Sequence, residues 1–188
     1  MPADPQVLFV ENHDSFSWNV IDCLPVGRAC VQVVRASEGV EHLWRAQVLV
    51  IGPGPTDPQR AGLIELVREA GVRRVPTLGI CLGHQALGLA FGAKLVSATP
   101  AHGKTGRVRF GRSRRFPGVE GELEAMRYHS LALEEVGAPL EVVGRLEDGT
   151  VMAVEHTGLP MAGLQFHPDS HGTPRGRELV AAFFRSLE

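Results

Sequence analysis

The sequence is poor in cysteine and has almost no excess of charge. Its three cysteines, Cys23, Cys30 and Cys81, are too few and of the wrong parity for a disulfide framework, so a cysteine in a special setting is expected to be reactive. The 19 Lys and Arg residues nearly balance 21 Asp and Glu residues, for a formal net charge of −2. This balance argues against capture of nucleic acid or of an anionic membrane by charge.

Long hydrophobic runs are also missing. No segment approaches the roughly 20 apolar residues of a membrane span, and residues 1–5 lack the basic and apolar regions of a signal peptide. We therefore expect a cytoplasmic protein. Hydrophobic residues make up 44% of the chain, enough to exclude wholesale disorder. The length fits the range of roughly 100–200 residues per domain, which predicts a single domain over residues 1–188.

Short apolar runs alternate with helical patterns in the first half of the chain. Strands are expected at residues 7–10, 31–34, 48–51 and 75–80. One helix is expected around Phe16–Leu24, with Asp14 or Ser15 as N-cap, and another around Leu63–Ala70, ended by Gly71. This alternation predicts an α/β fold with a doubly wound, mostly parallel open sheet, flavodoxin-like, and helices on both faces.

The second half is expected to extend the sheet and to close the domain. Strand-like pieces at residues 108–110, 140–143 and 151–154, separated by glycines and charges, predict an antiparallel extension. A final helix is expected with Thr173 as N-cap and Pro174 at its first position. Its inner face would carry Leu179, Val180, Phe183, Phe184 and Leu187.

The segment Gly79–Gly83 has the pattern of a nucleophile elbow, with Cys81 in place of the serine. A sharp strand-to-helix turn leaves little room for neighbouring side chains, hence the flanking glycines. The start of the helix favours a thiolate, and the N–H of Leu82 would form half of an oxyanion hole. The alternative is a structural cysteine buried in a tight turn. Cys23 and Cys30 have no such setting.

A thiolate needs a base, and the segment Gly163–Asp169 offers one. His167 ends an apparent strand, and the carboxylate of Asp169 follows two residues later. Two alternatives remain at this point. His167, Asp169 and His171 could imitate a metal site, although neither CxxC nor HExxH occurs. His167 could also be a satisfied structural histidine.

Several motifs together resemble a known family. In chain order they are Cys81–Gln85, Arg127–Leu131 and Gln165–Ser170, and they are similar to those of class I glutamine amidotransferases. The segments Asn12–Asn19, Pro53–Pro55 and His102–Thr105 further resemble the glutaminase subunits of anthranilate synthase and aminodeoxychorismate synthase. The likeness spans nearly the whole chain and implies the amidotransferase fold.

The resemblance implies a mechanism as well. Cys81 would attack the side-chain amide carbon of L-glutamine, His167 would carry the proton to the leaving ammonia, and Asp169 would orient the imidazole. Water would then hydrolyse the glutamyl thioester. Gly54 N–H would complete the oxyanion hole with Leu82 N–H. The resemblance places these residues in the glutamine pocket: Gly54, Pro55, Thr56, Gln85, Ser130 and Leu131.

The resemblance also implies a partner. Ammonia would pass to a chorismate-using synthase subunit, that of anthranilate synthase or, alternatively, of aminodeoxychorismate synthase, and the glutaminase subunit would need no metal or cofactor. Communication between the subunits would need a movable loop near the elbow, and the loop over residues 52–57 is our hypothesis for it. The basic stretch over residues 104–115 is interpreted as a solvated charged hairpin, or as a docking surface for the synthase.

Two residues depart from the family pattern. Asp169 stands where the family usually has Glu, and Thr56 stands where the loop usually has another glycine. We expect weaker orientation of His167, and a β-branched side chain at Thr56 that lies near the bound substrate and restricts φ there. Because of these two departures, one alternative is that the protein is a binding subunit whose active site is catalytically weakened. A free-standing cysteine hydrolase acting on another amide or γ-glutamyl bond is a further alternative.

Overall fold

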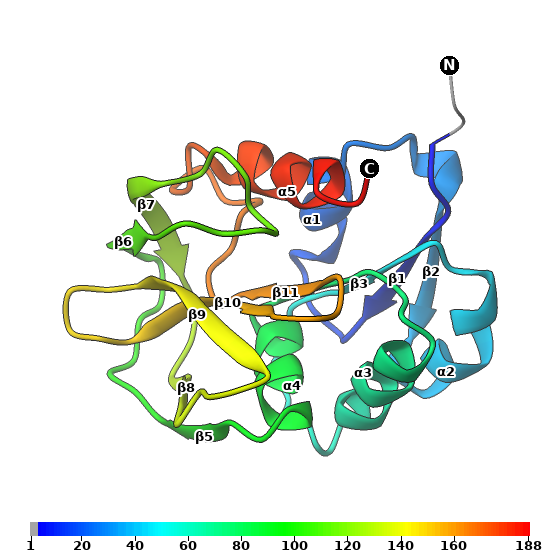
Figure 1. Cartoon of the computed structure of the whole chain (residues 1–188), viewed down its shortest axis with the longest axis horizontal. Coiled ribbons are helices and arrows are strands. Elements are labelled where there is room, and N and C mark those ends of the chain that lie inside the picture. Colours follow the sequence, from blue (N-terminus) through cyan, green and yellow to red (C-terminus); the bar gives the residue numbers. More distant parts are fainter. Residues whose placement is uncertain (1–3) are drawn as a thin grey trace.

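The computed structural model describes residues 4–188 and is organised around one large sheet (Figure 1). The nine strands lie in the order β2-β1-β3-β4-β11-β10-β9-β6-β7. The parallel part consists of β1 (Val7–Glu11), β2 (Val31–Arg35), β3 (Val48–Ile51), β4 (Thr77–Ile80) and β11 (Met161–Leu164). The antiparallel extension consists of β6 (Lys104–Phe110), β7 (Gly121–Arg127), β9 (Leu140–Arg145) and β10 (Val151–His156). The predicted fold class is therefore confirmed.

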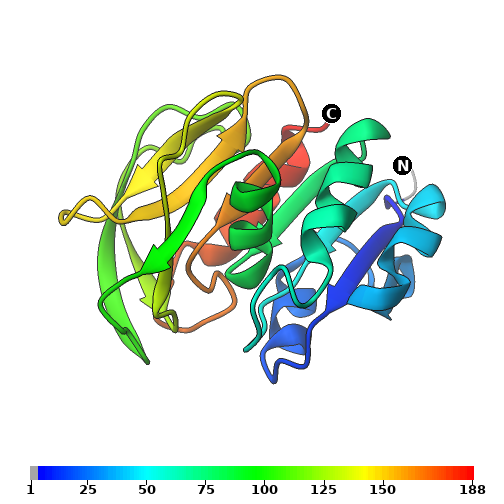
Figure 2. The ribbon, with the colours of Figure 1, turned by 90° about the horizontal axis from the view of Figure 1, so that it is seen from below.

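Helices cover both faces of the parallel part (Figures 1 and 2). One face carries α1 (Ser17–Cys23) and α5 (Gly176–Arg185), and the other carries α2 (Gly39–His42), α3 (Leu63–Val72) and α4 (Leu82–Ala90). Side chains of β1 alternate between two cores, with Phe9 in one and Leu8 in the other. This double burial explains why the strands are continuous apolar runs. Within residues 4–188, no helix is long and apolar enough to cross a membrane.

Two predicted helix starts are wrong. Helix α5 begins at Gly176 after Arg175, not at Pro174. The hydroxyl of Thr173 instead donates to the carbonyl of His167 at 2.7 Å and accepts the N–H of Met126 at 2.9 Å. Helix α1 has Phe16 as its N-cap, while Asp14 Oδ1 accepts the N–H of Phe16 at 2.8 Å. In both cases the side-chain oxygen that was expected to cap the helix accepts a backbone N–H group that lies outside the helix.

Other element boundaries also differ from the expectations. Helix α3 continues through Gly71 to Val72. A Cβ at Gly71 would lie 3.4 Å from Leu159 Cδ1 and 3.7 Å from Met161 Cε. The fourth strand begins at Thr77 instead of residue 75. The bounds of strand β7 were not anticipated, although its alternation of exposed acids with buried Leu123 and Ala125 has the period of a strand. Strands β5 (Lys94–Ser97) and β8 (Leu131–Glu134) pair as a separate two-stranded sheet.

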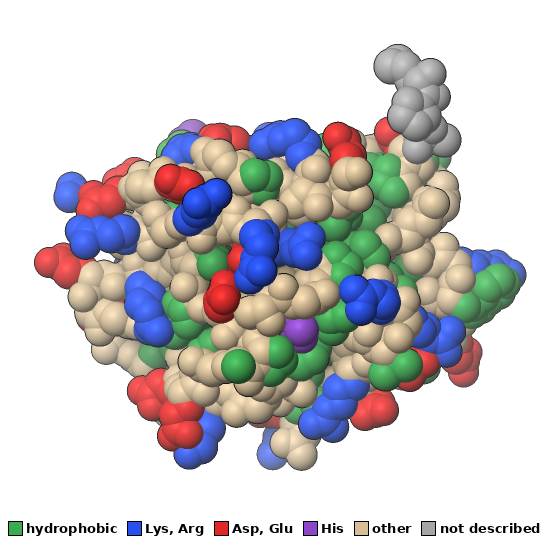
Figure 3. Space-filling view, in the orientation of Figure 1, with side chains coloured by type: hydrophobic (Ala, Val, Ile, Leu, Met, Phe, Trp, Pro, Cys, Tyr) green, Lys and Arg blue, Asp and Glu red, His purple; other side chains and the backbone are tan. Residues whose placement is uncertain are grey.

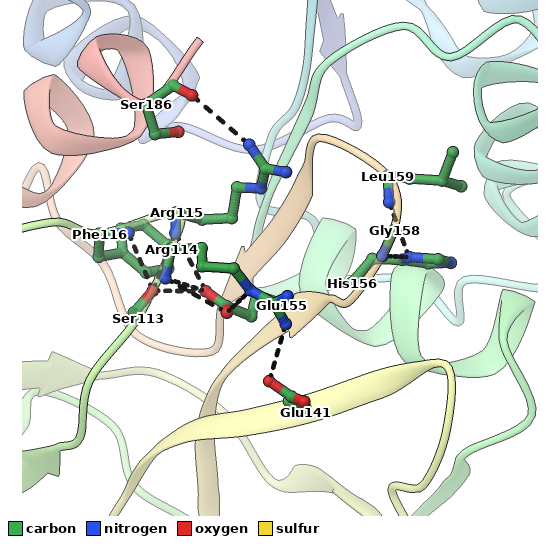
Figure 4. A network of polar contacts seen from close by, with 10 residues as sticks. All are labelled: Ser113, Arg114, Arg115, Phe116, Glu141, Glu155, His156, Gly158, Leu159 and Ser186. Carbon is green, nitrogen blue, oxygen red and sulfur yellow. Dashed lines mark hydrogen bonds and ion pairs between the residues drawn. The ribbon is translucent and has the colours of Figure 1, made fainter.

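The basic stretch forms strand β6 and the loop that follows it. Arg109 pairs with Glu122 on β7 at 3.1 Å, so the predicted charged hairpin is confirmed. Glu155 on β10 is buried and accepts hydrogen bonds from the Ser113 hydroxyl and the backbone N–H groups of Arg114 and Arg115 (Figure 4). Burial alone raises the pKa of Glu155, but these donors outweigh it and lower the pKa. Acidic and basic side chains are interspersed on the face in Figure 3.

Candidate active site

The candidate residues meet where the parallel strands end. Asn12 follows β1, the segment Gly52–Gly54 follows β3, Cys81 follows β4, and His167 lies shortly after β11. In open α/β sheets, ligands bind at the carboxyl ends of the strands, near the point where the strand order reverses. Here β1 lies between β2 and β3, so that point falls between β1 and β3, beside Asn12 and Gly54.

Cys81 lies in a strained turn between β4 and α4. Its backbone has φ 50° and ψ −95°, and the residue is 7% exposed. A Cβ at Gly79 would lie 2.4 Å from the backbone of Gly83, and one at Gly83 would lie 2.4 Å from the carbonyl oxygen of Ile51. Both positions therefore exclude side chains, and the predicted elbow is confirmed. A positive φ at a non-glycine residue costs on the order of 1–3 kcal/mol and is typical of functional sites.

The loop after β3 lies against the start of α4. A Cβ at Gly54 would lie 2.7 Å from Leu82 Cδ2 and 2.7 Å from Asn12 Cβ. The side chain of Asn12 donates to the carbonyl oxygens of Val10 at 3.3 Å and Gly52 at 3.1 Å, which ties this loop to the end of β1. The two expected oxyanion-hole residues, Gly54 and Leu82, are thus adjacent in space.

His167 is held by its backbone and by two aromatic rings. Its N–H donates to Met126 O at 3.0 Å. The imidazole meets Phe16 and Tyr128 edge to face, with centroid distances of 5.5 Å and 5.0 Å, and these two rings stack on each other at 5.2 Å. Phe16 and Tyr128 belong to motifs that the sequence analysis singled out, but their contact with His167 was not anticipated. Together these contacts limit rotation of the imidazole.

Two neighbouring groups control the charge of His167. Burial lowers the pKa of His167, but Asp169 and Cys81 outweigh burial and raise the pKa to about 9. His167 Nδ1 lies 3.5 Å from Asp169 Oδ1, and the Asp169 side chain is fully buried. Among residues 4–188, neither this nitrogen nor the Asp169 oxygens have a hydrogen-bond partner. The contact is therefore longer than a well-formed hydrogen bond, and it fits the weaker orientation expected from the short carboxylate. An imidazolium beside Cys81 favours the thiolate.

The residues expected in the substrate pocket differ in their exposure. Gln85 is buried and donates to Leu131 O at 3.5 Å, so these two residues are in contact. Pro55, Thr56 and Ser130 are exposed.

Sequence reasoning missed Gln165 as a site residue and did not anticipate the burial of His84. Gln165 is fully buried, and its Nε2 donates to Cys81 Sγ at 3.6 Å. The available signal was an amide inside the apolar sequence Leu164–Phe166. His84 is also fully buried, and among residues 4–188 its ring nitrogens have no hydrogen-bond partner. Burial lowers its pKa to about 3, so the ring is neutral near pH 7.

The remaining candidates have simpler settings. All three cysteines are free thiols, and buried Cys23 contacts the carbonyl oxygen of Pro168 at 4.0 Å. Burial raises the pKa of the Cys23 thiol, which makes it a poor nucleophile. His171, the third member of the alternative metal set, is exposed. Over the described residues 4–188, no group of three or more His, Cys, Asp or Glu side chains is arranged to hold a metal ion.

Comparisons with known proteins agree with this geometry. The family model described as glutamine amidotransferase class-I matches residues 8–187. Aminodeoxychorismate synthase from Streptomyces griseus is 40% identical over 95% of this chain, which spans only 25% of that protein. Anthranilate synthase component 2 from Azospirillum brasilense is 38% identical over 96% of this chain and 95% of its own length.

A solved structure shows the same fold at lower sequence identity. A glutamine amidotransferase from Methylobacillus flagellatus has a TM-score of 0.73 and 18% identity, covering 99% of this chain and 96% of that one. The family model covers almost the whole chain, and its match includes the elbow, His167 and the carboxyl ends of the parallel strands. The chain belongs to the class I glutamine amidotransferase family.

Proposed function

We propose that this protein is a glutaminase subunit that hydrolyses L-glutamine to glutamate and ammonia through a thioester on Cys81. The observation that carries the proposal is the pairing of a cysteine on a strained elbow with a histidine whose pKa is raised to about 9. That pairing supports a thiolate and an imidazolium in the resting enzyme. The same imidazolium is a general acid for the leaving ammonia.

The chemistry runs in two stages. The Cys81 thiolate attacks the side-chain amide carbon of glutamine, and the carbonyl oxygen becomes an oxyanion that the N–H groups of Leu82 and Gly54 stabilise. His167 gives its proton to the nitrogen, the C–N bond breaks, and ammonia leaves. Neutral His167 then takes a proton from water, whose oxygen attacks the thioester. The C–S bond breaks, glutamate leaves, and the thiolate and imidazolium are restored.

The substrate pocket is proposed to lie beside the elbow. Gln85 and Leu131 would form its buried wall, and Gly54, Pro55, Thr56 and Ser130 would complete it. Polar groups from separate segments suit a small zwitterion, because its α-amino and α-carboxylate groups both need partners. Thr56, where the family pattern has glycine, is proposed to restrict the loop at this side of the pocket.

The ammonia is proposed to pass to a chorismate-using synthase subunit, because free ammonia near pH 7 is mostly protonated and no longer nucleophilic. The Azospirillum relative, similar over nearly its whole length, is named anthranilate synthase component 2, which supports component II of anthranilate synthase. The Streptomyces relative is named aminodeoxychorismate synthase, which supports the second candidate.

The continuous sheet supports a single domain. A cytoplasmic location stays a prediction from the sequence.

The nucleophile is tested by labelling. A chloroketone analogue of glutamine is expected to modify Cys81 selectively, as located by mass spectrometry, and L-glutamine is expected to protect it. Cys81→Ser is expected to abolish the labelling, while Cys30→Ser serves as the matched control and leaves it unchanged. Absence of selective, protectable labelling would favour a catalytically weakened binding subunit.

The acceptor is tested with the partner present. Anthranilate synthase component I and chorismate are added, and formation of anthranilate from glutamine is followed; the aminodeoxychorismate partner is tested in parallel. Product is expected with wild type and not with Cys81→Ser. Ammonium salts should restore product formation by the mixture that contains Cys81→Ser. High glutaminase activity that neither partner changes would favour a free-standing hydrolase.

A further inference from the structure

The side chain of Gln165 contacts the nucleophile directly. It lies just after β11, is fully buried, and places Nε2 at 3.6 Å from Cys81 Sγ. We propose that Gln165 is a catalytic residue whose amide N–H stabilises the Cys81 thiolate. The inference rests on the proposed role of Cys81 as nucleophile and adds a hydrogen-bond donor on the sulfur, separate from the two oxyanion-hole donors.

The direction of the Gln165 amide follows from its neighbours. The carbonyl of Leu131 can only accept, so the Gln85 group that faces it at 3.5 Å must be the nitrogen. The same Gln85 nitrogen lies 3.2 Å from the other end of the Gln165 amide, which must therefore be the oxygen. The nitrogen of Gln165 is then the atom that faces sulfur. A single carbonyl thus fixes the orientation of both amides.

Leu131 is in turn held by a second donor. His129 Nδ1 lies 3.0 Å from Leu131 O, and Arg127 Nε donates to His129 Nε2 at 3.3 Å. Because Nε2 accepts, Nδ1 carries the proton and donates to the carbonyl. Burial and then the charge of Arg127 lower the pKa of His129 to about 4, so this ring stays neutral near pH 7. The carbonyl that orients Gln85 therefore has a fixed partner of its own.

A donor on sulfur matters because Cys81 is buried. Desolvation disfavours a thiolate, and a hydrogen bond to the charged form favours it. Hydrogen bonds to charged groups are worth more than those between neutral groups. Removal of this donor is therefore expected to lower the fraction of Cys81 present as thiolate, by about tenfold near pH 7.

The test measures thiolate formation rather than turnover. Alkylation of Cys81 by iodoacetamide is followed against pH in a Cys30→Ser background, with the modified residue located by mass spectrometry. Gln165→Met keeps the length of the side chain and removes the donor. We expect alkylation near pH 7 to slow about tenfold and the alkylation profile to move toward higher pH, with the melting temperature recorded in parallel. A folded Gln165→Met protein with an unchanged profile would overturn the proposal.

A second variant decides the matter if Gln165→Met does not fold. Gln165→Glu keeps the shape and still accepts from Gln85, but it places a carboxylate oxygen against sulfur, so the profile should move upward further. An unchanged profile in this variant also overturns the proposal. The glutamine-analogue labelling of wild type separates the two hypotheses: its failure refutes Cys81 as the nucleophile, whereas unchanged profiles with labelling intact refute only the role of Gln165.

Discussion

At the scale of single residues, the charge of His167 depends on a carboxylate that reaches it only by a long contact. Asp169 Oδ1 is 3.5 Å from His167 Nδ1, beyond the usual length of an N–H···O hydrogen bond. The interaction still outweighs burial and, together with Cys81, raises the pKa of His167 to about 9. The carboxylate of Asp169 is therefore the first of the two groups that keep the imidazole protonated.

Replacing this charge tests that view. In Asp169→Asn, burial is no longer offset by the carboxylate, so the pKa of His167 is expected to fall well below about 9. The glutaminase rate near pH 8 is expected to fall at least about tenfold. An NMR titration of the imidazole reports the pKa. The exposed acid Glu65 on α3 offers a control. Glu65→Gln is expected to leave the pKa of His167 unchanged.

The same change has a consequence for stability. A histidine whose folded-state pKa is raised stabilises the fold fully below about pH 6.5, and this contribution is lost as the pH rises through about 9. The difference in free energy of unfolding between wild type and Asp169→Asn should therefore shrink over that interval, as measured in urea. A His167 titration near pH 9 in Asp169→Asn would contradict the role given to the carboxylate.

At the scale of elements, the elbow exists because β3, β4 and α4 approach each other at their backbones. Gly79 meets Gly83, and Gly83 meets the carbonyl oxygen of Ile51 on β3, at distances that a Cβ would reduce to 2.4 Å. Helix α4 can therefore begin directly above the sheet, with Cys81 forced to φ 50°. This close packing maintains the strained backbone of the nucleophile.

A methyl group at this contact should disrupt the elbow. Gly79→Ala is expected to lower the free energy of unfolding by roughly 1–3 kcal/mol and to slow alkylation of Cys81, because the backbone of Gly83 cannot yield without moving α4. Gly111→Ala is the matched control, since a Cβ there has nothing within 4 Å. Urea unfolding measures both. Equal stabilities of the two variants would show that the packing at the elbow is not tight.

At the scale of the whole molecule, the antiparallel extension is joined to the parallel part near His167. Met126 at the end of β7 accepts the N–H of His167 at 3.0 Å, and the Thr173 hydroxyl links Met126 N–H to His167 O. The chain then passes so close to Pro168 that a Cβ at Gly176 would lie 1.8 Å from its carbonyl oxygen. The base of the proposed mechanism, which follows the parallel strand β11, is thus anchored to β7, the edge strand of the antiparallel extension.

The hydroxyl of Thr173 can be removed without changing the shape of the side chain. Thr173→Val is expected to lower the free energy of unfolding by about 1–3 kcal/mol, because it leaves the buried N–H of Met126 without its acceptor. Thr173→Ser keeps the hydroxyl and should recover most of the loss. Urea denaturation measures both variants. A Thr173→Val protein as stable as wild type would exclude this link between the two parts of the sheet.

The sequence by itself determined the strand–helix alternation, the elbow and the candidate pair of Cys81 and His167. These features depend on local patterns, namely short apolar runs, helical spacing and glycines at a sharp turn. Only the tertiary structure decided that Thr173 holds His167 instead of capping α5. It also decided that Gln165 faces Cys81. Gln165 and Cys81 are 84 residues apart, and the Thr173 hydroxyl also accepts from Met126, 47 residues away. A polar side chain binds whichever partner the packed fold brings within reach.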